Sequence, residues 1–171
     1  MNVANKLTML RIILVPVFMG IMYMPDGKGA FWGAVIFALA SITDFLDGYL
    51  ARKYNMITNF GKFMDPLADK ILVAAAMISM VEFDMIPAWM VVIIIAREFA
   101  ISIIRAIAAS SGKVIAASNW GKAKTVSQIA AILMVLLNIP FGMIVMYIAV
   151  GLTLYSGYDY IALNKEIITM E

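Results

Sequence analysis

The sequence predicts an all-α integral membrane protein, a bundle of six transmembrane helices with both termini on the cytoplasmic side. Of its 171 residues, 64% are hydrophobic and only 14% are charged, which is far more apolar than a soluble domain. The apolar residues fall into six runs of roughly 20 residues, the length that crosses the hydrocarbon core of a bilayer. We therefore expect a single membrane-embedded domain that covers residues 1–171.

The first three runs are separated by short polar turns. After a polar start that can lie at the membrane surface, we expect the first span at Leu10–Met24. The turn Pro25–Gly29 contains proline and glycine, which interrupt helices, and the second span follows at Ala30–Leu50. The segment Tyr54–Phe60 contains two asparagines and is the natural turn before the third span, Gly61–Val81.

Three further spans follow. An acidic turn at Glu82–Asp84 leads into the fourth span, Ile86–Ala109. A polar connection over residues 110–120 leads into the fifth span, Lys122–Leu137. An asparagine and a proline end that span, and the sixth covers Phe141–Tyr160.

The basic residues predict the orientation of the bundle. With an even number of spans, both termini lie on one side. That side collects most of the cations: Lys6, Arg11, Arg52, Lys53, Lys62, Lys113, Lys122, Lys124 and Lys165. The opposite turns hold a single lysine, Lys28, and three acidic residues. Because lysine and arginine are enriched in cytoplasmic loops, we expect both termini and the turn after the second span to be cytoplasmic.

The most informative stretch is Asp44–Lys70, which holds four of the seven aspartates. Asp44 and Asp47 are three residues apart, so they share one face of a helix. Asp65 and Asp69 are four residues apart and also share a face. If the two helices pack antiparallel, four carboxylates approach one another and repel strongly. Divalent cations relieve this repulsion, and an all-oxygen set of ligands favours Mg²⁺ or Mn²⁺.

Two other interpretations of these aspartates remain open. The carboxylates could form interhelical ion pairs that only hold a bundle together, with Arg52, Lys53, Lys62 and Lys70 as partners. They could also line the cation site of a transporter. Acids within membranes rarely occur without a function, and transporter sites tend to lie near the bilayer midplane rather than at one edge. Both arguments favour a metal-dependent catalytic site. The chain has no cysteine and no histidine, so catalysis would depend on carboxylates, lysines, arginines, hydroxyls or metal.

The same stretch resembles the motif of the CDP-alcohol phosphatidyltransferase family. It reads D-x2-D-G-x2-A-R-x8-G-x3-D-x3-D, with every fixed position filled: Asp44, Asp47, Gly48, Ala51, Arg52, Gly61, Asp65 and Asp69. Eight fixed residues at fixed spacing over 26 positions make a highly specific match.

The resemblance implies roles for individual residues. Asp44, Asp47 and Asp65 would hold one divalent ion, and Asp44, Asp65 and Asp69 a second. Asp69 would also be the general base that takes the proton of the acceptor. The residues implied for CDP-diacylglycerol are Asn5, Thr8, Gly48, Arg52 and Thr58, with Gly48 leaving room for the cytidine and Arg52 facing the pyrophosphate. A homodimer is implied by the resemblance alone.

A second, softer resemblance points to the bacterial phosphatidylglycerophosphate synthase branch of this family. It rests on Arg97-Glu98, Arg105, the run Gly121-Lys122-x-Lys124-Thr125-x-x-Gln128 and the opening Asn5-Lys-Leu-Thr8-x-x-Arg11. The implied reaction joins CDP-diacylglycerol and sn-glycerol 3-phosphate to give phosphatidylglycerophosphate and CMP. The phosphate of this acceptor needs cations, for which the candidates are Arg105, Lys113 and Lys122.

Alternatives remain for these polar residues too. Arg97 and Glu98 could form an internal ion pair. The lysines could instead contact anionic lipids at the cytoplasmic surface. The acceptor could also be inositol phosphate, or serine in an enzyme of the same chemistry.

Overall fold

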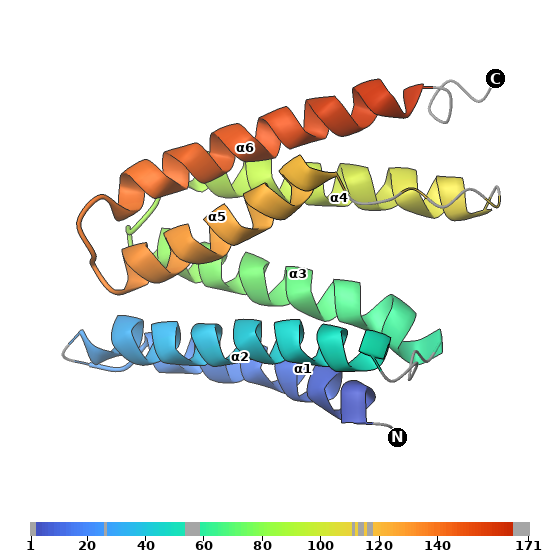
Figure 1. Ribbon diagram of the computed structural model, residues 1–171. Coiled ribbons are helices and arrows are strands. Elements are labelled where there is room, and N and C mark those ends of the chain that lie inside the picture. Colours follow the sequence, from blue (N-terminus) through green and yellow to red (C-terminus); the bar gives the residue numbers. More distant parts are fainter. Residues whose placement is uncertain are drawn as a thin grey trace. The chain divides into compact units, whose positions relative to one another are not determined.

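The chain is described by a computed structural model over residues 3–25, 27–53, 59–110, 112, 115 and 118–165, with side chains at 7–25, 27–44, 64, 67–110, 112, 115 and 118–165. This part of the chain contains six α-helices and no strand (Figure 1). They are α1 (Val3–Met22), α2 (Lys28–Lys53), α3 (Asn59–Glu82), α4 (Ala88–Ser110), α5 (Asn119–Leu136) and α6 (Gly142–Leu163). The predicted all-α class is confirmed.

Each predicted span corresponds to one helix, in the predicted order. The largest difference lies in α1, which begins at Val3 rather than at Leu10. The helix therefore extends beyond the expected span into the more polar residues before it. Thr8 is fully buried, so α1 is already packed against its neighbours at this residue, two positions before the expected start of the span.

The chain divides into two compact units. Unit 1 comprises Met1–Met85 and Ile132–Ile139, and unit 2 comprises Ile86–Ala131 and Pro140–Glu171. Helices α1, α2 and α3 therefore lie in unit 1, whereas α4, α6 and most of α5 lie in unit 2.

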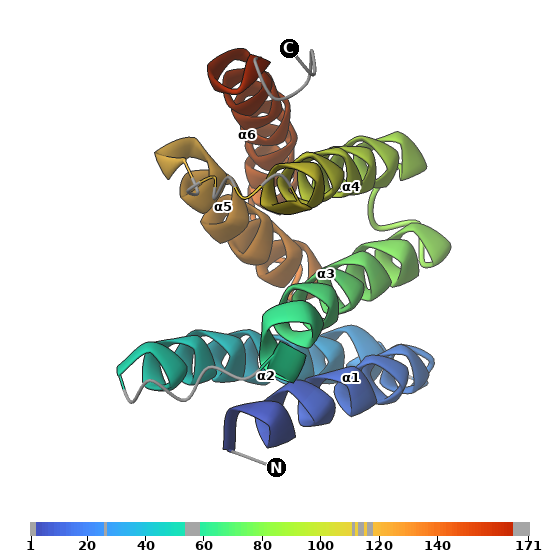
Figure 2. The ribbon, with the colours of Figure 1, turned by 90° about the vertical axis from the view of Figure 1, so that its right-hand side faces the viewer.

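In unit 1, α1 packs against both α2 and α3. The view of Figure 2 shows α1 and α2 side by side along their length. Phe18 of α1 and Phe37 of α2 are fully buried, and their ring centroids lie 6.5 Å apart. From α3, Ala68 and Ala76 are fully buried as well. The core of this unit thus combines two aromatic rings with small side chains that let the helices approach closely.

The turn between α1 and α2 depends on a glycine. A Cβ atom added at Gly29 would lie 2.4 Å from the carbonyl oxygen of Met22, so only glycine allows this approach of the two helix ends. The turn is also joined to the end of α3, because the Tyr23 hydroxyl donates a hydrogen bond of 2.6 Å to Glu82 Oε1. The rings of Tyr23 and Phe83 meet edge to face, with centroids 5.3 Å apart.

In unit 2, α4 packs against α6. Met90 and Ile94 of α4 and Met146 and Ala149 of α6 are fully buried. Side-chain hydrogen bonds join α5 to both of these helices. Apolar packing therefore forms the core of unit 2, and polar contacts between its helices lie beside that core.

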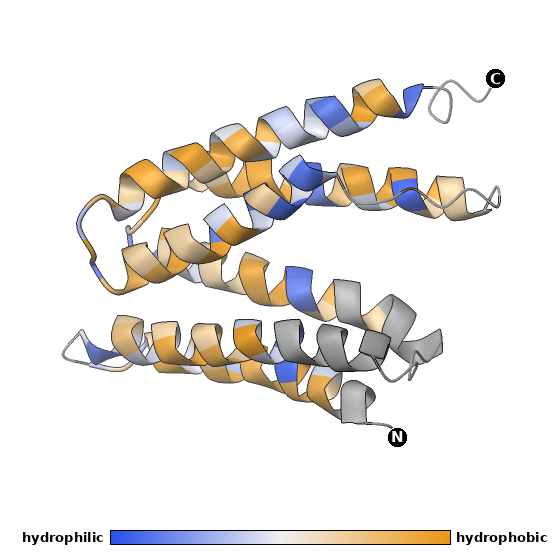
Figure 3. Ribbon diagram, in the orientation of Figure 1, coloured by the Kyte–Doolittle hydropathy of each residue, from blue (hydrophilic) through white to orange (hydrophobic). Residues whose placement is uncertain are grey.

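Apolar residues make up much of the described helices (Figure 3), and many of the large ones are exposed. Large residues that are more than half exposed include Leu39 and Ile42 of α2, Val92 of α4 and Leu154 of α6. Within the described residues, α6 alone is both long and apolar enough to cross a membrane, and Leu7–Met22 is a shorter apolar segment. The six predicted membrane crossings therefore stay a prediction.

The close approach at Gly29 leads to a stability prediction. We expect Gly29→Ala to lower the midpoint of thermal unfolding in detergent by several degrees, equivalent to about 1–3 kcal/mol, because the new methyl group overlaps backbone atoms. The matched control is Gly20→Ala in α1, where an added Cβ meets nothing within 4 Å. That change should leave the midpoint unchanged or raise it, and equal effects of both substitutions would contradict the prediction.

Candidate functional site

The four aspartates of the predicted metal site lie on α2 and α3 of unit 1. The side chains of Asp44 and Asp69 are described, and both are partly exposed. Those of Asp47 and Asp65 lie outside the described part. Among the described side chains, no group of three or more histidine, cysteine, aspartate or glutamate residues is close enough to hold a metal ion. The predicted ligand set therefore stays a prediction.

Asp44 has a partner that the sequence interpretation did not propose. Arg11 Nη1 lies 2.7 Å from Asp44 Oδ1. The Arg11 side chain is only 1% exposed, while that of Asp44 is 38% exposed. A guanidinium buried this deeply is costly unless a counter-charge compensates it, so this ion pair ties α1 to α2. Arg11 is the only charged residue between Leu7 and Met24, and that isolation was the signal for a specific partner.

Thr8 lies one helical turn before Arg11 and is also fully buried. Positions three apart share a face of a helix, so both polar residues belong to the side of α1 that faces the interior of unit 1. The predicted role of Thr8 toward the nucleotide is not tested by this arrangement.

For several other predicted site residues the structure does not describe the side chain. For Asn5, Gly48 and Arg52 the helical backbone is described but the side-chain surroundings are not, and Thr58 and Lys113 are not described at all. Their predicted roles stay predictions.

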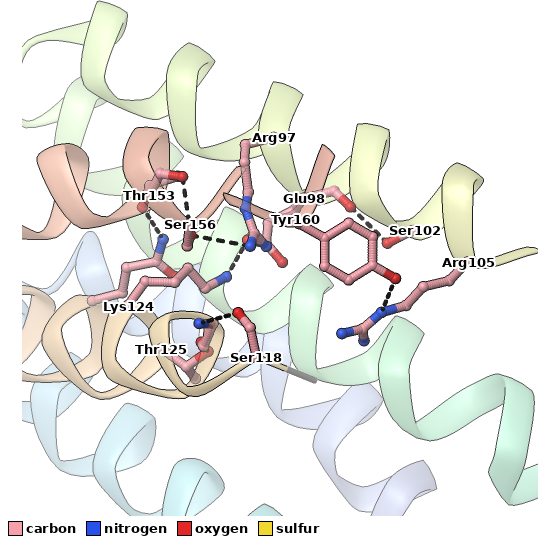
Figure 4. A network of polar contacts seen from close by, with 12 residues as sticks. Arg97, Glu98, Ser102, Arg105, Ser118, Lys124, Thr125, Thr153, Ser156 and Tyr160 are labelled. Atoms are coloured by element: carbon pink, nitrogen blue, oxygen red, sulfur yellow. Dashed lines mark hydrogen bonds and ion pairs between the residues drawn. The ribbon is translucent and has the colours of Figure 1, made fainter. Parts of the chain in front are cut away.

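Unit 2 contains a partly buried network of charged and hydroxyl groups (Figure 4). Arg97 Nη1 donates to Glu98 Oε1 at 3.2 Å, and Arg97 Nη2 donates to Ser156 Oγ at 3.0 Å. Lys124 of α5 donates a hydrogen bond to the same Glu98 oxygen. The predicted internal ion pair of Arg97 and Glu98 is confirmed.

The network separates two lysines for which the sequence left the same alternative open, contact with anionic lipid. Lys124 is 4% exposed and is paired with Glu98, so contact with lipid at the surface is the wrong interpretation for it. Lys122, two residues earlier on α5, is exposed. The lipid alternative and the predicted phosphate role both stay open for Lys122.

A polar stripe on α6 completes the network and was missed from the sequence. Thr153, Ser156 and Tyr160 are all buried and fall three and four residues apart, on one face of the helix. Gln128 Nε2 donates to Thr153 Oγ1 at 2.9 Å, which joins α5 to α6. Three polar residues at this spacing in an otherwise apolar helix were the available signal.

Arg105 occupies the far end of this polar region on α4 (Figure 4). Its Nε donates a hydrogen bond of 3.2 Å to the Tyr160 hydroxyl, and its Cζ lies 5.4 Å from the centre of the Tyr160 ring. Arg105 is exposed, whereas Tyr160 is buried. Unlike Arg97, Arg105 has no carboxylate partner among the described residues. Of the three cations predicted for the acceptor phosphate, Arg105 and Lys122 thus present exposed positive charge.

Comparison with known proteins gives a consistent result across the chain. The family model of the CDP-alcohol phosphatidyltransferases matches residues 1–155. A Bacillus subtilis protein called CDP-diacylglycerol–glycerol-3-phosphate 3-phosphatidyltransferase is 46% identical, over 96% of each chain. A Haemophilus influenzae protein with the same description is 40% identical, over 96% of this chain and 94% of its own. A Mycobacterium tuberculosis protein described as a probable phosphatidylglycerophosphate synthase is 40% identical, over 94% of this chain and 80% of its own.

The contrast between Lys124 and Lys122 can be tested directly. We expect Lys124→Met to lower the free energy of unfolding by about 2 kcal/mol, because Glu98 keeps Arg97 but loses the charge-assisted hydrogen bond that joins α4 to α5. Lys122→Met, on the same helix, should change it by less than about 0.5 kcal/mol, since exposed charges contribute little to stability. Thermal unfolding of both variants in one detergent measures the difference, and a similar loss in both would refute the assignment.

Proposed function

This chain belongs to the CDP-alcohol phosphatidyltransferase family, and from that premise we propose that it transfers the phosphatidyl group from CDP-diacylglycerol to sn-glycerol 3-phosphate. The products are phosphatidylglycerophosphate and CMP, a step in phospholipid synthesis. The observation that carries the proposal is the intact eight-residue aspartate motif in a chain that aligns end to end with relatives named for this transfer.

The proposed chemistry is a substitution at phosphorus. The hydroxyl oxygen of the acceptor forms a bond to the phosphorus that carries the diacylglycerol. The bond between that phosphorus and the oxygen of CMP breaks, and CMP leaves with the electron pair. The hydroxyl proton goes to Asp69, our candidate for the general base, because the chain has no histidine to take that role.

The aspartates suit divalent metal ions. Asp44 and Asp69 are partly exposed carboxylates on helices of the same unit, and carboxylate oxygens are the ligands that Mg²⁺ and Mn²⁺ prefer. We propose that Asp44, Asp47, Asp65 and Asp69 hold two such ions. Bound there, the ions would neutralise the charge of the pyrophosphate and of the leaving CMP.

The remaining residues are assigned to the two substrates. For CDP-diacylglycerol the proposal names Asn5, Thr8, Gly48, Arg52 and Thr58. For the phosphate of the acceptor it names Arg105, Lys113 and Lys122. The exposed guanidinium of Arg105 and the exposed Lys122 support the second group, since a phosphate binds through charge-assisted hydrogen bonds.

We further propose a single domain of six membrane-spanning helices with a cytoplasmic active site, acting as a homodimer. The family is membrane-associated in general, and the many exposed apolar side chains support burial in lipid. The positive charges near the aspartate motif support its cytoplasmic position. Cross-linking in mild detergent that yields only monomer would count against the homodimer.

Release of CMP by purified protein tests the function. With CDP-diacylglycerol and Mg²⁺, we expect CMP to appear when glycerol 3-phosphate is added, and EDTA should abolish it because the carboxylates then lack their ions. Inositol phosphate, serine and phosphatidylglycerol, offered one at a time, should give none. Turnover with one of these acceptors instead would preserve the chemistry and overturn the assigned acceptor.

The proposed base gives a sharper prediction. Asp69→Asn should lower kcat by about 10²-fold or more while CDP-diacylglycerol still binds, because a carboxamide cannot accept the proton. Asp84→Asn is the control, since Asp84 is exposed and its positive φ of 55° suits asparagine. Near-normal turnover of Asp69→Asn would remove Asp69 from this role.

A further inference from the structure

Two arginines of α4 form hydrogen bonds with hydroxyl groups of α6. Only one of them also pairs with a carboxylate. Arg97 bonds to Ser156, and Arg105, eight residues later, bonds to Tyr160. Glu98 lies against Arg97 and compensates its charge. The Tyr160 hydroxyl is a neutral acceptor, so it orients Arg105 without compensating its charge.

The contact uses only one side of the Arg105 guanidinium. A guanidinium offers five N–H donors, of which the pair at Nη1 and Nη2 forms the fork that binds carboxylates and phosphates through two parallel hydrogen bonds. Tyr160 engages Nε. The two Nη groups have no hydrogen bond within the described residues, and the residue is exposed. The fork is therefore available to a ligand.

Tyr160 itself is well suited to fix an orientation. It is 2% exposed, and a buried tyrosine ring has little freedom to move because the interior is close-packed. An arginine side chain loses less conformational entropy on binding a ligand when a rigid partner already restricts it. A carboxylate at the same place would hold Arg105 equally firmly, but it would also compete with an anionic ligand for the charge.

We propose that Tyr160 is a positioning residue, which presents the terminal N–H fork of Arg105 to the phosphate monoester of the acceptor. The inference rests on the proposed function, and it adds a residue of α6 to the acceptor site. Tyr160 acts through Arg105 and does not touch the reacting atoms.

Tyr160→Phe tests this, because it removes one oxygen atom and retains the buried ring. We expect KM for glycerol 3-phosphate to rise about fivefold to tenfold, as the fork loses its fixed orientation. The kcat and the KM for CDP-diacylglycerol should stay within about twofold of the parent values. Tyr158→Phe on the same helix is the matched control, since Tyr158 is 74% exposed, and it should change none of the three constants.

A double-mutant cycle separates positioning from a purely structural role. In an Arg105→Gln background, adding Tyr160→Phe should change KM for glycerol 3-phosphate by less than about twofold, because the group that Tyr160 orients is already gone. If the two effects multiply instead, Tyr160 acts independently of Arg105 and the proposal fails. A lower unfolding midpoint with unchanged KM in Tyr160→Phe would likewise show a structural role alone.

The outcomes distinguish this inference from the proposed function. A parent protein that releases CMP only with an unphosphorylated acceptor overturns both. A parent that works with glycerol 3-phosphate, beside a Tyr160→Phe variant with unchanged KM, overturns the inference and leaves the function intact. If Tyr160→Phe does not fold, Arg105→Lys is measured instead, because it keeps the charge of an exposed side chain and loses the fork. An unchanged KM for glycerol 3-phosphate in that variant overturns the proposal.

Discussion

The cost of placing charge inside apolar helices governs this structure. In unit 1 the buried guanidinium of Arg11 is compensated by Asp44 across the contact of α1 and α2. In unit 2 one carboxylate, Glu98, pairs with both Arg97 and Lys124. Removing either anion would leave a cation in surroundings that cannot solvate it. The two pairings therefore specify how helices of each unit lie against their neighbours, which apolar packing alone specifies only loosely.

The same rule separates charges that hold the structure from charges that can serve a ligand. Lys124 is buried, Arg97 is partly buried, and both pair with Glu98 inside unit 2. Arg105 and Lys122 are exposed, and among the described residues the hydrogen-bond partner of the Arg105 guanidinium is a neutral phenol. Charge that the protein itself does not compensate attracts anions. This distinction, rather than position along the chain, favours Arg105 and Lys122 for the acceptor phosphate.

Much of the fold could be predicted because apolar runs of this length have few alternatives. All six helices were expected in order, and the aspartate motif identified the family on its own. The partners of the charged residues could not be predicted, because they depend on which helix faces which. Arg11 was absent from the cations considered for Asp44, and Lys122 and Lys124 looked equivalent in the sequence although they point into different surroundings. Only the tertiary structure distinguishes them.

Helix α6 shows why average hydropathy conceals such detail. It is apolar enough to cross a membrane, yet Thr153, Ser156 and Tyr160 form one buried polar face within it. A mean over the whole helix weighs these three hydroxyls against many aliphatic side chains, whereas a neighbouring helix meets only one face. Since that face bonds to α4 and α5, the most apolar helix also orients the arginines of its unit. In an apolar helix, the polar contacts thus come from one face. The spacing of the few polar residues in the sequence indicates which face that is.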